Sequence, residues 1–148
     1  MVMVEGSSMG LKAGNRLTMT DARGHVTKYA YDEQGRLVKA TYPDGSTADY
    51  EYTSAGKLVK VTDAAGSVQT YTVNGNGFNT SQSDWLGNVT EYAYNTQNKV
   101  TSVTDPMGNS TTYAYDGAGN LVLTTDANGN TVSYTYDSEG RMISMTDG

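Results

Sequence analysis

The sequence contains no cysteine, and its 148 residues include only one histidine, one phenylalanine, one tryptophan, one isoleucine and two prolines. Without cysteine the chain has no disulfide framework, no thiolate nucleophile and no cysteine-ligated zinc. Leucine, isoleucine, valine and phenylalanine together number 22, which excludes a thick hydrophobic core. The net charge is only −6, and 12 tyrosines and 21 threonines favour strands over disorder.

Basic residues and long apolar runs are also scarce. Ten Lys and Arg against 16 Asp and Glu argue against a phosphate-binding surface, so we expect no nucleic-acid partner. No apolar run approaches the roughly 20 residues that cross a bilayer, and we expect no membrane insertion. Residues 1–13 lack the pattern of a signal peptide, and we interpret them as a poorly ordered leader or expression scar.

Glycine recurs in two series, each with a spacing of 21 residues. The first series is Gly14, Gly35, Gly56, Gly77, Gly119 and Gly140, with Asn98 in the one missing place. The second series is Gly24, Gly45, Gly66, Gly87, Gly108 and Gly129. Self-similarity at a fixed period indicates a repeat architecture, here six full repeats and a partial seventh over residues 14–148.

Tyrosine follows the same period. The first tyrosine series is Tyr29, Tyr50, Tyr71, Tyr92, Tyr113 and Tyr134. The second series, two residues later, is Tyr31, Tyr52, Tyr94, Tyr115 and Tyr136, with Val73 in the missing place. We interpret these tyrosines as residues that define the repeat, together with the glycines Gly24, Gly35, Gly45, Gly56, Gly66, Gly87, Gly108, Gly119, Gly129 and Gly140.

Each repeat contains two runs rich in Val, Thr and Tyr, separated by D-x-x-G turns. Asp bonds the following backbone in such turns, and Gly adopts a positive φ. The pattern predicts an all-β fold, an antiparallel meander of 21-residue β-hairpin repeats in a curved, single-layer sheet of about 13 strands.

The odd period constrains the two turns of each repeat. Equivalent side chains stay on one face only if the two loops differ in parity or a bulge intervenes. We infer that the turns are not equivalent, one having four residues and the other three with a Gly bulge. We favour an apolar face that joins the tyrosines to residues such as Val38 and Ala40, with Leu37, Leu58, Leu121 and Met142 on the other face.

The unit resembles the YD repeat of the Rhs family. The resemblance rests on Tyr29-Ala-Tyr31-Asp32-Glu-Gln-Gly35-Arg36-Leu37 and on the matching segments at Tyr113–Leu121 and Tyr134–Met142. It implies a piece of a spiral β-shell that encloses a polypeptide, as in bacterial polymorphic toxins, toxin complexes and teneurin-like shells. The parent would then be secreted or on the cell surface, with an encapsulated polypeptide as its partner.

Candidate sites have structural alternatives. His25 is interpreted as an exposed residue at the start of a strand, because no nucleophile is evident beside a catalytic base. The turn aspartates suit calcium, but each turn supplies one carboxylate, and turn capping accounts for them better. Carboxylates repeated in every unit favour architecture over a glycosidase, so we expect no enzyme, metal or cofactor.

The tyrosines either stack sugars or pack across strands, and we favour packing. Phe78 and Trp85 are candidates for a unique contact. The function expected is therefore a structural repeat module of a shell wall, with a carbohydrate- or protein-binding module at the cell surface as the alternative. Open sheet edges at both ends favour homo-oligomerisation.

Overall fold

The computed structural model describes residues 8–12 and 15–148, where every regular element is a strand and no helix occurs. The strands are β1 (Ser8–Lys12), β2 (Asn15–Thr20), β3 (Val26–Tyr31), β4 (Leu37–Thr41), β5 (Thr47–Tyr52), β6 (Leu58–Thr62), β7 (Val68–Val73), β8 (Asn79–Ser83), β9 (Val89–Tyr94), β10 (Val100–Thr104), β11 (Ser110–Tyr115), β12 (Leu121–Thr125), β13 (Thr131–Tyr136) and β14 (Met142–Asp147). The expected all-β class is confirmed.

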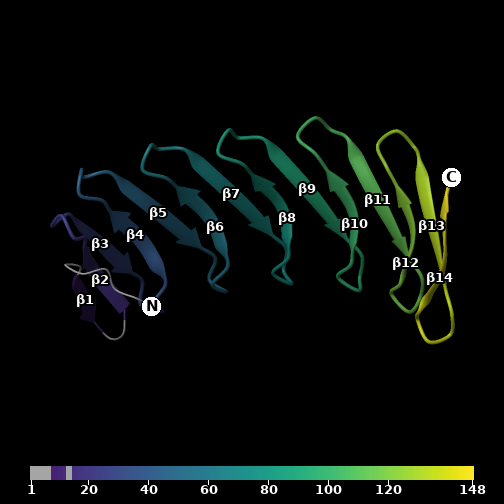
Figure 1. Cartoon of the computed structure of the whole chain (residues 1–148), viewed down its shortest axis with the longest axis horizontal. Coiled ribbons are helices and arrows are strands. Elements are labelled where there is room, and N and C mark those ends of the chain that lie inside the picture. The colour runs from purple at the N-terminus through teal and green to yellow at the C-terminus, as the bar shows by residue number, and fades with distance from the viewer. Residues whose placement is uncertain (1–7, 13–14) are drawn as a thin grey trace. The chain divides into compact units, whose positions relative to one another are not determined.

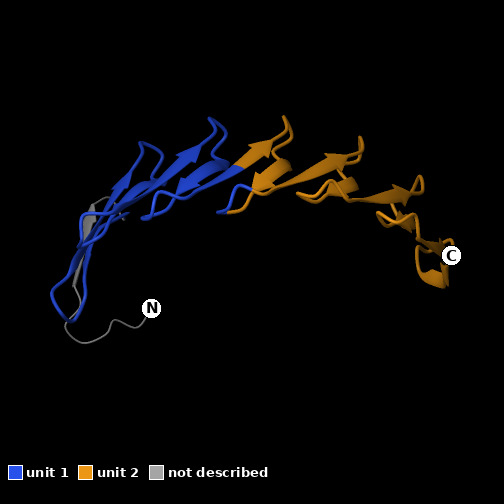
Figure 2. Ribbon diagram, turned by 90° about the horizontal axis from the view of Figure 1, so that it is seen from above, with its two compact units in different colours: residues 1–70, 85–87 blue, residues 71–84, 88–148 orange. Residues whose placement is uncertain are grey.

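Each strand pairs antiparallel with the next in the chain, which is the predicted meander (Figure 1). Two compact units result, residues 1–70 with 85–87 and residues 71–84 with 88–148 (Figure 2). Strand β7 contributes its first half to the former, opposite β6, and its second half to the latter, opposite β8.

The expected leader, residues 1–13, lies largely outside the described residues. Within it, Ser8–Lys12 forms strand β1, which pairs with β2. No helix in the described part of the chain is long and apolar enough to cross a membrane.

The register puts the tyrosines on one face with the residues predicted to join them. Tyr29 lies directly opposite Ala40, Tyr50 opposite Val61 and Tyr92 opposite Val103. Opposed residues in an antiparallel pair share a face. None of the large side chains described is fully buried, whereas the small Ala40 and Ala48 are 3% and 4% exposed. Burial is therefore deepest where small residues stand among tyrosines.

The two turns of a repeat are equivalent, so the inference that they differ is wrong. In both kinds the first residue's N–H donates to the carbonyl four residues later, and the Gly N–H donates back to the first residue's carbonyl. Asp32–Arg36 and Asp63–Ser67 show this with distances of 2.9–3.0 Å.

A β-bulge after the first-series glycine, and not a difference between the turns, keeps equivalent side chains of successive repeats on one face. Leu37 and Val38 of β4 both oppose Tyr31, and the register shifts there by one residue. The same shift recurs opposite Tyr52, Val73, Tyr94, Tyr115 and Tyr136. The β4–β5 hairpin shows no such shift. One extra residue per repeat is what an odd period requires.

The bulge also changes where four apolar residues lie. The residues expected on the other face oppose second-series tyrosines, so that assignment is wrong at the bulge. These residues are Leu37, Leu58, Leu121 and Met142, which oppose Tyr31, Tyr52, Tyr115 and Tyr136.

Candidate functional site: turns and tyrosines that join the repeats

The turn aspartates cap their own turns. Asp105 Oδ1 accepts hydrogen bonds from the backbone N–H groups of Met107 (2.9 Å) and Asn109 (2.8 Å). Asp116, Asp126 and Asp137 do the same. The Asp therefore bonds the backbone two and four residues on, which stabilises the turn locally.

The residue after the turn glycine closes a second bond to the same carboxylate. Asn109 Nδ2 donates to Asp105 Oδ2 at 2.8 Å, and Asn130 Nδ2 donates to Asp126 Oδ2 at 2.7 Å. His25 occupies this position at the first turn, with its Nδ1 3.1 Å from Asp21 Oδ2. His25 is thus an exposed partner of its turn aspartate, in the place where sequence put an exposed residue.

These bonds hold the carboxylates in the charged form. The side-chain amides of Asn109, Asn120 and Asn130 are the main cause that lowers the pKa of Asp105, Asp116 and Asp126 respectively.

The turn glycines adopt the left-handed backbone that other residues avoid. Their φ values lie between 77° and 88°, and Asn98 adopts 61° in the place of the missing glycine. The residues with this conformation are Gly24, Gly35, Gly45, Gly56, Gly66, Gly77, Gly87, Gly108, Gly119, Gly129 and Gly140.

Four tyrosines of the second series join their repeat to the one before it. The Tyr115 hydroxyl donates to the carbonyl of Val100 at 2.8 Å, fifteen residues earlier. Val100 is the first residue of its bulge, where the ladder is disrupted and a carbonyl needs another donor. Equivalent bonds join Tyr52 to Leu37 (2.9 Å), Tyr94 to Asn79 (2.7 Å) and Tyr136 to Leu121 (2.8 Å). We call these bonds the tyrosine clamps.

In two repeats the residue after a first-series glycine packs on the second-series tyrosine sixteen residues later. The guanidinium carbon of Arg36 lies 4.8 Å from the centre of the Tyr52 ring. Phe78 holds the equivalent position in the repeat of residues 77–97, where its ring lies 5.5 Å from that of Tyr94. Phe78 therefore replaces a cation–π contact with an aromatic pair. Trp85 is 44% exposed in the β8–β9 turn.

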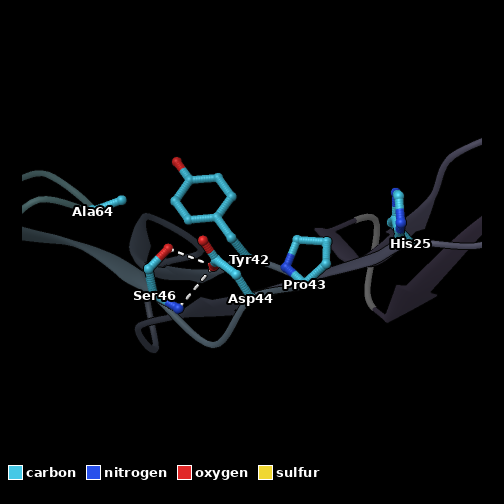
Figure 3. Close-up of a pocket in the computed structure, with 6 residues that line it drawn as sticks. All are labelled: His25, Tyr42, Pro43, Asp44, Ser46 and Ala64. Carbon is cyan, nitrogen blue, oxygen red and sulfur yellow. Dashed lines mark hydrogen bonds between the residues drawn. The ribbon is translucent and has the colours of Figure 1, made fainter.

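A hollow of about 640 Å³ lies along the turns that hold the second glycine series in the first unit. Figure 3 shows Tyr42, Asp44 and Ser46 between His25 and Ala64. Asp44 accepts hydrogen bonds from the N–H (2.9 Å) and the hydroxyl (2.6 Å) of Ser46. Tyr42, the one tyrosine outside both series, is 36% exposed here.

A second hollow of about 630 Å³ lies in the second unit, between the Asp116–Asn120 and Asp137–Arg141 turns. Tyr134 and Tyr136 line it together with Asp116 and Asp137. In the described part of the chain no three His, Asp or Glu side chains are grouped so that they could hold a metal ion. The residues that line the two hollows offer hydrogen-bonding groups and tyrosine rings.

The bulge and the clamps follow from spatial relationships that sequence reasoning missed. The sequence did contain one sign of the clamps. Each second-series tyrosine stands fifteen residues after the second residue that follows a first-series glycine, as Tyr52 does after Leu37. Periodicity alone does not show that these two positions are in contact, because every pair of positions in a repeat recurs at a constant interval.

Comparison with known proteins identifies the repeat. The RHS Repeat family model matches residues 12–47, 94–131 and 115–148, more than half of the chain. The chain belongs to the RHS repeat family. The resemblance of its units to YD repeats is thus confirmed. No curated protein matches the RHS repeat chain in sequence.

Solved structures share the fold of this RHS repeat chain. One is the Photorhabdus luminescens Tc holotoxin pore with a substitution in TccC3 (18% identity, TM-score 0.67, 96% of this chain and 9% of that chain). Another is TcdB2-TccC3 without its hypervariable C-terminal region (18% identity, TM-score 0.68, 96% of this chain and 9% of that chain). A third is TcdB2-TccC3-Cdc42 (22% identity, TM-score 0.61, 83% of this chain and 7% of that chain). This chain therefore spans less than a tenth of their length.

Proposed function

We propose that this array is a non-catalytic structural module, part of the wall of a hollow β-shell that encloses a toxin or other polypeptide. The tyrosine clamps carry the proposal. Their hydroxyls donate hydrogen bonds to main-chain carbonyls of the preceding repeat, which is a structural use of these side chains. The parent protein would be secreted or displayed on the cell surface.

Limited proteolysis of the complete polypeptide that contains the array tests this function. We expect the enclosed segment to resist protease until the wall is opened by Tyr115→Leu, which removes both a clamp and its ring. Met107→Lys alters an exposed turn side chain, 87% accessible, and serves as the control that keeps protection. Cleavage of the segment at the rate of the same segment made separately would contradict the proposal.

The second candidate is a carbohydrate- or protein-binding module, which the exposed Tyr42 in the first hollow favours. A glycan panel distinguishes the two functions. Binding that Tyr42→Ala abolishes, with the unfolding midpoint unchanged, supports the binding module.

A further inference from the structure

Successive turns on the edge with the first glycine series are separated by a slot, and one side chain from the earlier turn points into it. That side chain follows the first-series glycine and approaches the glycine of the next turn. A Cβ atom built on Gly56 would lie 3.4 Å from Arg36 Nη1, and one on Gly119 would lie 3.6 Å from Lys99 Cε.

Arg36 shows how a guanidinium group fits this slot. Its Nε donates to Asp32 Oδ2 at 2.6 Å, its Nη1 donates to the carbonyl of Thr53 at 3.1 Å, and its Cζ lies over the Tyr52 ring. The Arg36 side chain is 27% exposed, whereas that of Arg141 is 72% exposed. The slot therefore buries most of the Arg36 side chain and supplies acceptors for its guanidinium group.

The equivalent slot four repeats later remains partly open. Asn120 stands at the position of Arg36, and its shorter side chain bonds to Asp116 Oδ2 at 3.0 Å, with its Oδ1 3.8 Å from a Cβ atom built on Gly140. Tyr136, Asp116 and Asp137 stand where Tyr52, Asp32 and Thr53 stand around Arg36. The second hollow, of about 630 Å³, occupies the space beside them.

We propose that this open slot binds the guanidinium group of an arginine side chain from a partner polypeptide. The guanidinium stacks on Tyr136 and donates to Asp116 Oδ2 and the Asp137 carbonyl, as Arg36 does to their counterparts. A planar fork fits a ring and two acceptors, which an ammonium group does not.

The charges around the slot favour a cation. The carboxylates of Asp137 and Glu139 engage Arg141 at 2.7 and 2.9 Å. Among the described residues Asp116 bonds only neutral groups, the N–H groups of its turn and the Asn120 amide. Three carboxylates and one guanidinium thus surround the slot. This inference goes beyond the proposed wall and does not depend on an enclosed cargo.

Titration of the full chain with the peptide acetyl-Gly-Arg-Gly-amide, followed by NMR, tests the site. We expect saturable shifts of the Asn120 side-chain amide and the Tyr136 ring, with a dissociation constant of about 1–10 mM. The citrulline counterpart keeps the shape but lacks the charge, and we expect it to bind at least about fivefold more weakly.

Two matched variants locate the site. Asn120→Arg fills the slot from within, as Arg36 does, and should abolish the response while the chain stays folded. Asn130→Arg adds the same charge at the opposite end of β12 and should leave the response intact. Equal binding of the arginine and citrulline peptides, unchanged binding by Asn120→Arg, or the absence of any saturable shift would overturn the proposal.

Discussion

The Tyr115 hydroxyl bonds the main-chain carbonyl of Val100, whereas the Tyr113 hydroxyl, on the same strand, has no hydrogen-bond partner in the described part of the chain. The two tyrosine series are thus different in role although they share a face. The second series joins repeats through the bulge, and the first series contributes ring packing across strands.

Replacing Tyr115 with Phe tests the clamp. The change leaves the ring in place but leaves the Val100 carbonyl without its donor, so the free energy of unfolding should fall by about 1 kcal/mol. Urea denaturation measures the loss. Tyr113→Phe is the control and should change stability by much less, and equal losses from the two variants would show that the clamp contributes nothing.

The turn between β11 and β12 offers a matched pair of glycines. Gly119 has φ 87°, so Gly119→Ala should cost about 1–2 kcal/mol from backbone conformation. Its Cβ would meet Lys99 only at an ordinary 3.6 Å. Gly117 has no positive φ and open space around its Cβ, so Gly117→Ala should be neutral or slightly stabilising. Thermal unfolding of both variants distinguishes backbone strain at a positive φ from steric crowding of the new Cβ atom. An unchanged unfolding midpoint for Gly119→Ala would show that this turn does not need a glycine for its positive φ.

Acid should destabilise the array. The folded pKa of Asp105 lies below its ordinary value of 3.8 because Asn109 donates to the carboxylate. Its contribution to stability is therefore complete above that value and is lost as the pH falls through the lowered folded pKa. Urea unfolding at a series of pH values should show the decline.

Asp105→Asn provides the control for this pH dependence. Asn95 already caps an equivalent turn, accepting from the N–H groups of Gln97 and Lys99 at 3.0 Å. The variant should keep the turn and show a smaller loss of stability in acid. A pH profile identical to that of the parent chain would mean that this carboxylate does not contribute.

Open sheet edges predict self-association. Strand β14 pairs with β13 alone among the described strands, and its Met142, Ile143 and Met145 are 55%, 66% and 65% exposed. Light scattering should give a mass that rises with concentration, and Ile143→Lys should reduce it. Met107→Lys places the same charge in a turn and should not. A strict monomer at all concentrations would refute the prediction.

The sequence predicted the strands, the turns and the tyrosine face, because each depends on residues near one another in a 21-residue unit. It did not locate the bulge at Leu37 and Val38 or the bond from Tyr52 to Leu37, since both arise between strands. The equivalence of the turns was also missed, because a loop of different length and a bulge in a strand both keep the tyrosines on one face when the repeat has an odd number of residues. The 21-residue register puts Phe78 at the position of Arg36, but nothing in the residue types indicated that each would pack on a tyrosine sixteen residues later.

The bulge also restricts how an array of this kind changes length. Adding or removing 21 residues preserves both the direction of each following strand and the face its tyrosines occupy. A change of 20 or 22 residues keeps the direction but reverses the face, turning every later tyrosine away from its clamp. Duplication and loss in such genes are accordingly expected to proceed in whole repeats.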